Sequence, residues 1–175
     1  SNYHIGNPEK LIGGTPKVRF GKNREAIEAL LSIQSEGRTP TPKELDSMAA
    51  YTGWGSFGQE LFNGSWDYPR PKPEWEKESQ WLQGHLGKDN WQAAQASIIN
   101  AHYTDPPTVQ AMWDIAQRLG FEGGRILEPS IGIGNFFGLM PPSIMSKSRL
   151  AGIELDKLTG GMAQILYPEA NIQIK

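Results

Sequence analysis

Hydrophobic residues follow two different spacings along this chain, and the change between them near residue 100 divides it into a helical part and a mixed part. In the first part, Ile27, Leu30 and Leu31 recur every three to four residues. This spacing predicts a helix from about Asn23 to a stop at Gly37. The residues before it, 1–22, are rich in Gly and Pro and are predicted to be irregular.

Three further helices are predicted in the first hundred residues. Thr41, Pro42 and Glu44 combine an N-cap, a proline at the first helical position and the acid of a capping box. Apolar spacing predicts two more helices, over 75–84 and 89–100, on either side of a break that contains glycine. Residues 1–100 are therefore predicted to form a helical N-terminal region.

An aromatic stretch, residues 51–66, lies between these helices. Trp54 has a glycine on each side, and Phe57, Phe62 and Trp66 follow it. An aromatic ring on a flexible loop can stack on a nucleic-acid base. Aromatic side chains more often hold such a loop against the neighbouring core, and we favour this second interpretation.

After residue 100 the pattern changes to short apolar runs separated by helical stretches, which is typical of a parallel sheet with helical crossovers. Strands are predicted at 126–127, 150–155 and 171–175, and helices at 106–120 and 157–166. The chain is thus predicted to be an α/β protein, with a helical region followed by a partial Rossmann-like sheet in residues 101–175. Since a doubly wound sheet contains more strands than three, we expect either that the sequence is a fragment of a longer domain or that partner strands from elsewhere complete the sheet. We expect its open edge to be covered by the N-terminal helices or by a second copy of the chain.

The composition narrows the possible sites. The chain has no cysteine, which excludes disulfides and thiolate metal sites, and no metal site is predicted. Its formal net charge of -2 does not by itself indicate nucleic-acid binding. No apolar run approaches the roughly twenty residues of a membrane span, and no signal peptide is visible. We therefore expect a cytoplasmic protein without a membrane partner.

The residues that predict chemistry follow the first strand. Glu128 ends the apolar run, and Gly132 and Gly134 then allow a sharp turn and the close approach of a ligand. A carboxylate there repels a pyrophosphate but suits a ligand with a positive centre. Glu154 ends the next strand about twenty residues later, the spacing at which a strand-end acid meets ribose hydroxyls. Together these residues favour S-adenosylmethionine over NAD, and a tight turn without a ligand is the alternative.

Two segments resemble the class I DNA adenine-N6 methyltransferases. Residues 127–136, Leu-Glu-Pro-Ser-Ile-Gly-Ile-Gly-Asn-Phe, are similar to the cofactor motif of that family, although Ile131 stands where the family usually has a small residue. Residues 100–106, Asn-Ala-His-Tyr-Thr-Asp-Pro, are similar to the segment that precedes the motif. Residues 51–55, Tyr-Thr-Gly-Trp-Gly, resemble the N-terminal region of large phage and mobile-element proteins that join such a methyltransferase to a helicase.

The resemblance implies S-adenosyl-L-methionine as the cofactor, DNA as a partner and a helicase region in the same protein. It implies a Tyr-Thr-x-Pro turn that contacts the methionine end of the cofactor, and an acid that binds the ribose. The residues expected to bind the cofactor are Tyr103, Thr104, Glu128, Pro129, Ser130, Gly132, Gly134, Asn135, Glu154 and Leu155.

No catalytic residue is predicted. Residues 105–108, Asp-Pro-Pro-Thr, resemble the Asp-Pro-Pro-aromatic motif that holds a target amine, but the aromatic is missing and the segment precedes the cofactor strand. His102 has no carboxylate nearby in sequence and is interpreted as structural. The chain is therefore interpreted as the cofactor-binding part of a DNA adenine methyltransferase. Two alternatives remain, namely a non-catalytic DNA-binding or scaffolding module and a methyltransferase for RNA, protein or a small molecule.

Overall fold

The computed structural model of the chain describes residues 1–100 and 103–175, with the side chains of all of these except Ser56 and Asn100. His102, which the sequence indicates to be structural, lies outside the described residues.

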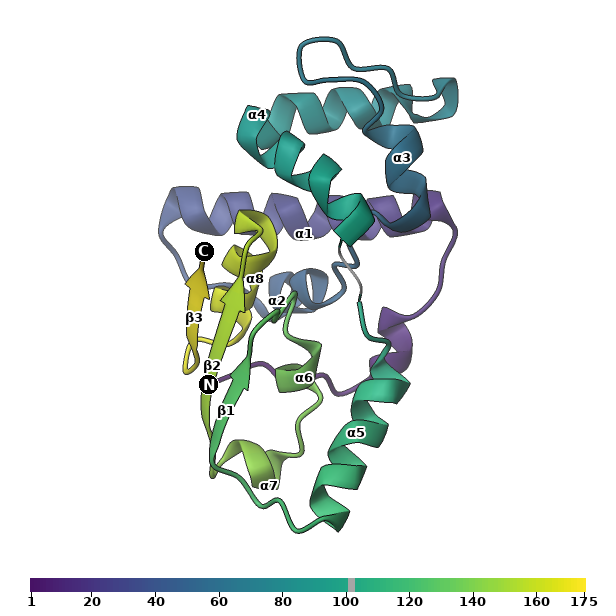
Figure 1. Ribbon diagram of the computed structural model, residues 1–175. Coiled ribbons are helices and arrows are strands. Elements are labelled where there is room, and N and C mark those ends of the chain that lie inside the picture. The colour runs from purple at the N-terminus through teal and green to yellow at the C-terminus, as the bar shows by residue number, and fades with distance from the viewer. Residues whose placement is uncertain (101–102) are drawn as a thin grey trace.

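The elements form two groups on either side of one long helix, α1 (Pro16–Glu36) (Figure 1). On one side lie α3 (Gly58–Leu61) and α4 (Glu76–Asn100). On the other side lie the sheet and α8 (Lys157–Leu166), and α1 packs directly on α8.

Helix α1 begins earlier than its apolar spacing predicts. Thr15 is the N-cap, its side-chain oxygen accepts the N–H of Val18 at 3.3 Å, and Pro16 takes the first helical position. The segment predicted to be irregular therefore ends at residue 15, because the cap and the proline fix the start of the helix. Gly37 ends the helix with a φ of 62°, as predicted.

The N-terminal arm, residues 1–15, packs on the body of the molecule and includes the 3-10 helix η1 (Pro8–Leu11). The N–H of Ile5 donates to the carbonyl of Gly138 at 2.9 Å. The Ile5 side chain is buried. The arm therefore contributes to the core ahead of the first predicted helix.

Helix α2 (Pro42–Ala49) confirms the predicted capping box. The side-chain oxygen of Thr41 accepts the N–H of Glu44 at 3.3 Å, and the Glu44 carboxylate accepts the N–H of Thr41 at 2.8 Å. Helix α2 packs on both α1 and α8.

The aromatic stretch is held against the core, as we predicted. Trp54 is buried and precedes the 3-10 helix η2 (Gly55–Phe57). Its ring lies between 5.1 and 6.4 Å, centroid to centroid, from the rings of Phe20, Tyr51, Phe57 and Phe62.

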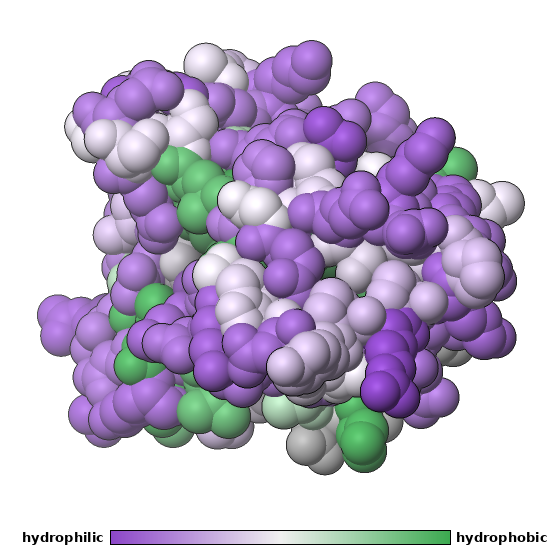
Figure 2. Space-filling model, turned by 90° about the horizontal axis from the view of Figure 1, so that it is seen from above, coloured by the Kyte–Doolittle hydropathy of each residue, from purple (hydrophilic) through white to green (hydrophobic). Residues whose placement is uncertain are grey.

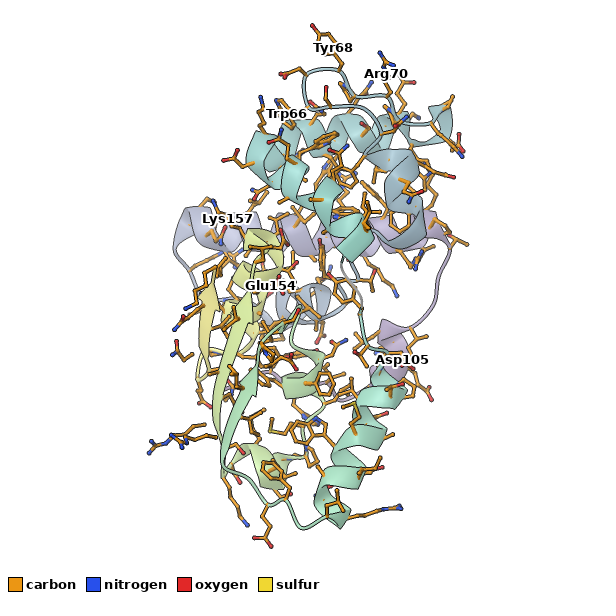
Figure 3. All side chains as sticks on the ribbon, in the orientation of Figure 1. Trp66, Tyr68, Arg70, Asp105, Glu154 and Lys157 are labelled. Atoms are coloured by element: carbon orange, nitrogen blue, oxygen red, sulfur yellow. The ribbon has the colours of Figure 1, made fainter. Side chains whose placement is uncertain are left out.

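Helix α4 consists of two helices that meet at Gly87, whose φ of 71° and ψ of 164° are not helical. The break falls where the sequence predicts it. Between α3 and the 3-10 helix η3 (Pro73–Trp75), the chain forms a hairpin closed by a bridge between Gly64 and Pro69. This hairpin carries Tyr68 at its outer end (Figure 3).

The three predicted strands form one parallel sheet in the order β1-β2-β3, which gives the chain an α/β fold. The strands are β1 (Arg125–Glu128), β2 (Arg149–Glu154) and β3 (Asn171–Ile174). In the register, Glu128 is paired with Gly152, and Gly152 with Ile172. Strand β1 is at one edge of the sheet.

The helices of this part are α5 (Pro106–Arg118), α6 (Asn135–Gly138), α7 (Pro142–Met145) and α8. Helix α5 starts where predicted, but the side chain of its N-cap, Asp105, makes no capping hydrogen bond. Helix α6, which follows the glycine turn, is only one turn long.

A single hydrophobic core joins the parts of the chain before and after residue 100. It includes Ile27 and Leu30 from α1 together with Leu158 and Met162 from α8. Seen from the α4 side, the surface is mainly hydrophilic, with hydrophobic residues in small separate patches (Figure 2). Within the described residues, no helix has both the length and the apolar character required to cross a bilayer.

Candidate functional site

A pocket of about 340 Å³ lies between the carboxyl ends of β1 and β2 and the N-terminal helices. Its sheet side is formed by Ser130, Ile131, Gly132, Ile133, Asn135, Phe136, Glu154, Leu155, Asp156, Leu158 and Thr159. Its helical side is formed by Tyr51, Trp54, Ala93, Ala94, Ala96, Ser97, Tyr103 and Thr104. Ligands of open parallel sheets bind beyond the carboxyl ends of the strands, so the pocket lies where such a fold places its ligand.

Glu154 lies at the end of β2 (Figure 3), and its carboxylate holds the glycine loop. One carboxylate oxygen accepts the N–H of Gly132 at 2.8 Å. The other accepts the N–H of Leu155 at 2.9 Å and of Asp156 at 3.0 Å. A carboxylate has about four acceptor positions, and three of them are used here. Glu154 therefore keeps the loop next to the strand end while one acceptor position remains for a ligand hydroxyl.

Asp156 caps the helix that follows Glu154. Its carboxylate accepts the backbone N–H of Thr159 at 2.9 Å and also the Thr159 hydroxyl. This bond satisfies one of the N–H groups that an α-helix leaves unpaired at its start. The cap fixes the direction of α8 and thereby the position of Leu155 at the rim of the pocket.

Two tyrosines on the helical side lie close to these carboxylates. Burial is the main cause that raises the pKa of Tyr51. The pKa of Tyr103 is also raised, mainly by partial burial of a ring that remains 39% exposed. The negative charges of Asp156 and Glu154 add to the increase. A hydrogen bond with Thr159 opposes the increase in each pKa. The two phenols therefore stay protonated at neutral pH.

The lining of the pocket is acidic and aromatic. Its charged residues are Glu154 and Asp156, and none of the described lining residues is Lys or Arg. Such a surface repels phosphate groups, whereas aromatic faces and carboxylates attract a cation. The volume falls within the range of small-molecule pockets. The residues present therefore suit a ligand with a positive centre, a nucleoside and no phosphate.

The structure brings most of the predicted cofactor residues to this pocket. Those that line it are Tyr103, Thr104, Ser130, Gly132, Asn135, Glu154 and Leu155. Those outside its lining are Glu128, Pro129 and Gly134.

The two predicted residues with the clearest alternative role are Glu128 and Gly134. The Glu128 carboxylate accepts the N–H of Ser130 at a long 3.3 Å. Gly134 has a φ of 86°, and a Cβ at this position would collide with the ring of Tyr167. The second glycine of the motif therefore allows close packing on a core tyrosine, a use that the motif alone does not distinguish from ligand contact.

Apart from Tyr103 and Thr104, the residues of the helical side were not predicted from the sequence. Ala93, Ala96 and Ser97 recur at helical spacing on the second half of α4 and face the pocket. Small residues at this spacing occur on many helices, so they give no signal of a site. Asp156 also lines the pocket and was not among the predicted site residues.

Comparison with known proteins gives two similarities. The chain is 26% identical over 167 residues to "Defense against restriction protein B" of Escherichia phage P1, and this alignment covers 95% of the chain and 6% of the phage protein. A solved structure from Listeria monocytogenes, described as that of a class I S-adenosylmethionine-dependent methyltransferase, is 13% identical. The superposition has a TM-score of 0.30 and covers 90% of this chain and 53% of the Listeria chain. No protein-family model matches the chain.

Proposed function

We propose that the pocket binds S-adenosylmethionine and that the chain is the cofactor-binding part of a methyltransferase. The observation that carries this proposal is the position of Glu154. It is a strand-end carboxylate bonded to the glycine loop, in a pocket whose described lining has two acids and no basic residue. S-adenosylmethionine combines a ribose diol with a sulfonium and an ammonium, whereas NAD brings a pyrophosphate into the same place.

In this proposal, each part of the ligand is contacted by a named group of the protein. Glu154 accepts a ribose hydroxyl with its remaining acceptor position, and Leu155, which is 81% exposed, covers the adenine. Tyr103, Thr104 and Gly132 would hold the methionine part. Its positive charge would be favoured there by the aromatic ring of Tyr103 and by the two acids of the pocket. When bound, S-adenosylmethionine supplies an electrophilic methyl group.

The methyl acceptor that we propose is the N6 amine of adenine in DNA, as the resemblance of residues 127–136 implies. The phage P1 protein is named for defence against restriction, and base methylation is a chemical means of protecting DNA from cleavage. We propose that this chain serves such a role as part of a longer protein that also carries a helicase region.

A second candidate function is a non-catalytic module that binds the cofactor or DNA and positions another part of the protein. The observation that favours it is the placement of Asp105. This acid of the Asp-Pro-Pro-Thr segment starts α5 and does not line the pocket (Figure 3). A methyl-transfer assay on DNA with radiolabelled cofactor and a longer protein would distinguish the two functions.

Calorimetric titration with S-adenosylmethionine tests the cofactor proposal, with NAD as the control ligand. We expect S-adenosylmethionine to bind and NAD to give no heat of binding. Binding should also raise the melting temperature, because a ligand at about 100 times its dissociation constant stabilises the folded state by roughly 2.7 kcal/mol. Binding of NAD, or of neither ligand, would refute the proposal.

A further inference from the structure

The turn at residues 51–55 has an unusual combination of features that the cofactor proposal does not use. It contains the Tyr-Thr-Gly-Trp-Gly sequence, and its aromatic residues Tyr51 and Trp54 are both buried. Between them, Gly53 has a φ of 67°, a conformation that residues with a side chain rarely adopt. The turn lies on the helical side of the pocket.

A buried asparagine of α1 holds this turn. Asn23 is fully buried, and its side-chain amide donates to the carbonyl of Gly53. Its side-chain oxygen accepts the N–H of Thr52 at 2.9 Å. A buried amide is costly unless it is hydrogen-bonded, and here its nitrogen bonds Gly53 while its oxygen bonds the adjacent Thr52. The turn is therefore fixed to α1 by the backbone on both sides of its glycine.

Tyr103 occupies the space that a side chain at residue 53 would need. A Cβ on Gly53 would lie 2.8 Å from Cε2 and 3.0 Å from the hydroxyl oxygen of Tyr103. On the other edge of the same ring, a Cβ on Gly132 would lie 3.8 Å from Cε1. The ring of Tyr103 thus lies between the turn of the helical region and the glycine loop of the sheet.

We propose that Gly53 and Asn23 are positioning residues that place Tyr103 against the glycine loop and so set the shape of the ligand pocket. This inference deepens the proposed function and rests on it only where ligand affinity is measured. It gives the Tyr-Thr-Gly-Trp-Gly turn a role at the site, and it makes the helical region part of the pocket.

The test compares Gly53→Ala with Gly37→Ala. Gly37 has a nearly equal φ of 62°, but a Cβ there would have no neighbour within 4 Å. The control therefore carries the same backbone strain without the collision with Tyr103. We expect the NMR signals of the Gly132 amide and the Tyr103 ring to shift in Gly53→Ala and to stay unchanged in Gly37→Ala. Unchanged signals in Gly53→Ala would overturn the inference.

The second readout is the affinity for S-adenosylmethionine. It is measured in a double-mutant cycle that combines Gly53→Ala with Tyr103→Ala. We expect Gly53→Ala alone to weaken binding about tenfold, the factor that corresponds to 1.4 kcal/mol. In the Tyr103→Ala background, Gly53→Ala should cause no further loss, because the ring through which it acts is absent. An equal loss in both backgrounds would contradict the inference.

Failure of the inference and failure of the proposed function give different results. If the unsubstituted protein does not bind S-adenosylmethionine, the proposed function fails. The NMR comparison of the two glycine variants then tests the inference by itself. If Gly53→Ala does not fold, the double variant with Tyr103→Ala decides it. Removal of the ring relieves the collision, so the double variant should fold and melt near the temperature of a Gly37→Ala, Tyr103→Ala double variant. A double variant that also fails to fold would overturn the inference.

Discussion

Replacement of Glu154 by glutamine should destabilise the protein because this carboxylate accepts three backbone hydrogen bonds, from Gly132 at 2.8 Å, Leu155 at 2.9 Å and Asp156 at 3.0 Å. A hydrogen bond to a charged group contributes roughly 1.5–3 kcal/mol. Glutamine removes the charge from all three bonds and replaces one acceptor oxygen by a donor. Since Glu154 is only partly buried, water compensates part of the loss, and we expect a cost of about 2 kcal/mol.

The structure offers a matched control in Glu128→Gln. Glu128 ends the neighbouring strand, is also partly buried, and accepts one long bond of 3.3 Å from Ser130. For a protein of this size, 2 kcal/mol lowers the melting temperature by roughly 4–8 °C, and Glu128→Gln should have a much smaller effect. Thermal denaturation followed by circular dichroism measures both. Equal melting temperatures for the two variants would refute the role of Glu154 in holding the glycine loop.

Three further predictions concern stability. Asp156→Ala removes the cap that Thr159 uses at the start of α8 and should cost about 1 kcal/mol in urea denaturation, whereas Asp156→Ser keeps most of it. Hydrogen bonds from Arg38 hold the pKa of Glu44 at about 2. The stability from this pair is thus complete above the ordinary carboxyl pKa and is lost as the pH falls towards 2. In Glu44→Gln, the free energy of unfolding should therefore decrease less as the pH falls than it does in the unsubstituted protein. Burial raises the pKa of Tyr167. The contribution of its neutral phenol to folding stability is therefore complete below the ordinary phenol pKa and is lost as the pH rises above it. Alkaline unfolding should accompany ionisation in a phenolate absorbance titration.

The sequence predicts elements well where one local interaction decides them. Thr41 and Glu44 form the capping box by themselves, and the start of α2 was correct. The start of α1 was wrong because the apolar residues were given more weight than Thr15 and Pro16, although these two also form a local signal. An N-cap threonine followed by proline predicts this helix start.

The residues of the candidate site also include some that the sequence predicts and some that it does not. Glu154 and Gly132 could be found because chain order and spacing encode a strand, a turn and a second strand. Most of the helical wall could not be found, since Ala96 reaches the pocket only through the packing of α4 against the rest of the chain, whereas Tyr103 was indicated by the family resemblance alone. Gly134 shows a different limit, because a glycine of the motif also allows close packing on the core residue Tyr167. The motif alone does not separate this use from ligand contact.

NMR mapping of S-adenosylmethionine on the isotopically labelled protein would show directly whether the pocket binds the cofactor. We expect the amides of Gly132 and Leu155 on the sheet side and of Ser97 on the helical side to shift together, with one shared dissociation constant. The outer hairpin at Tyr68 should remain unchanged and serves as an internal control. If saturating cofactor leaves Gly132 and Leu155 unshifted, or shifts only residues outside the pocket, the pocket is not the cofactor site.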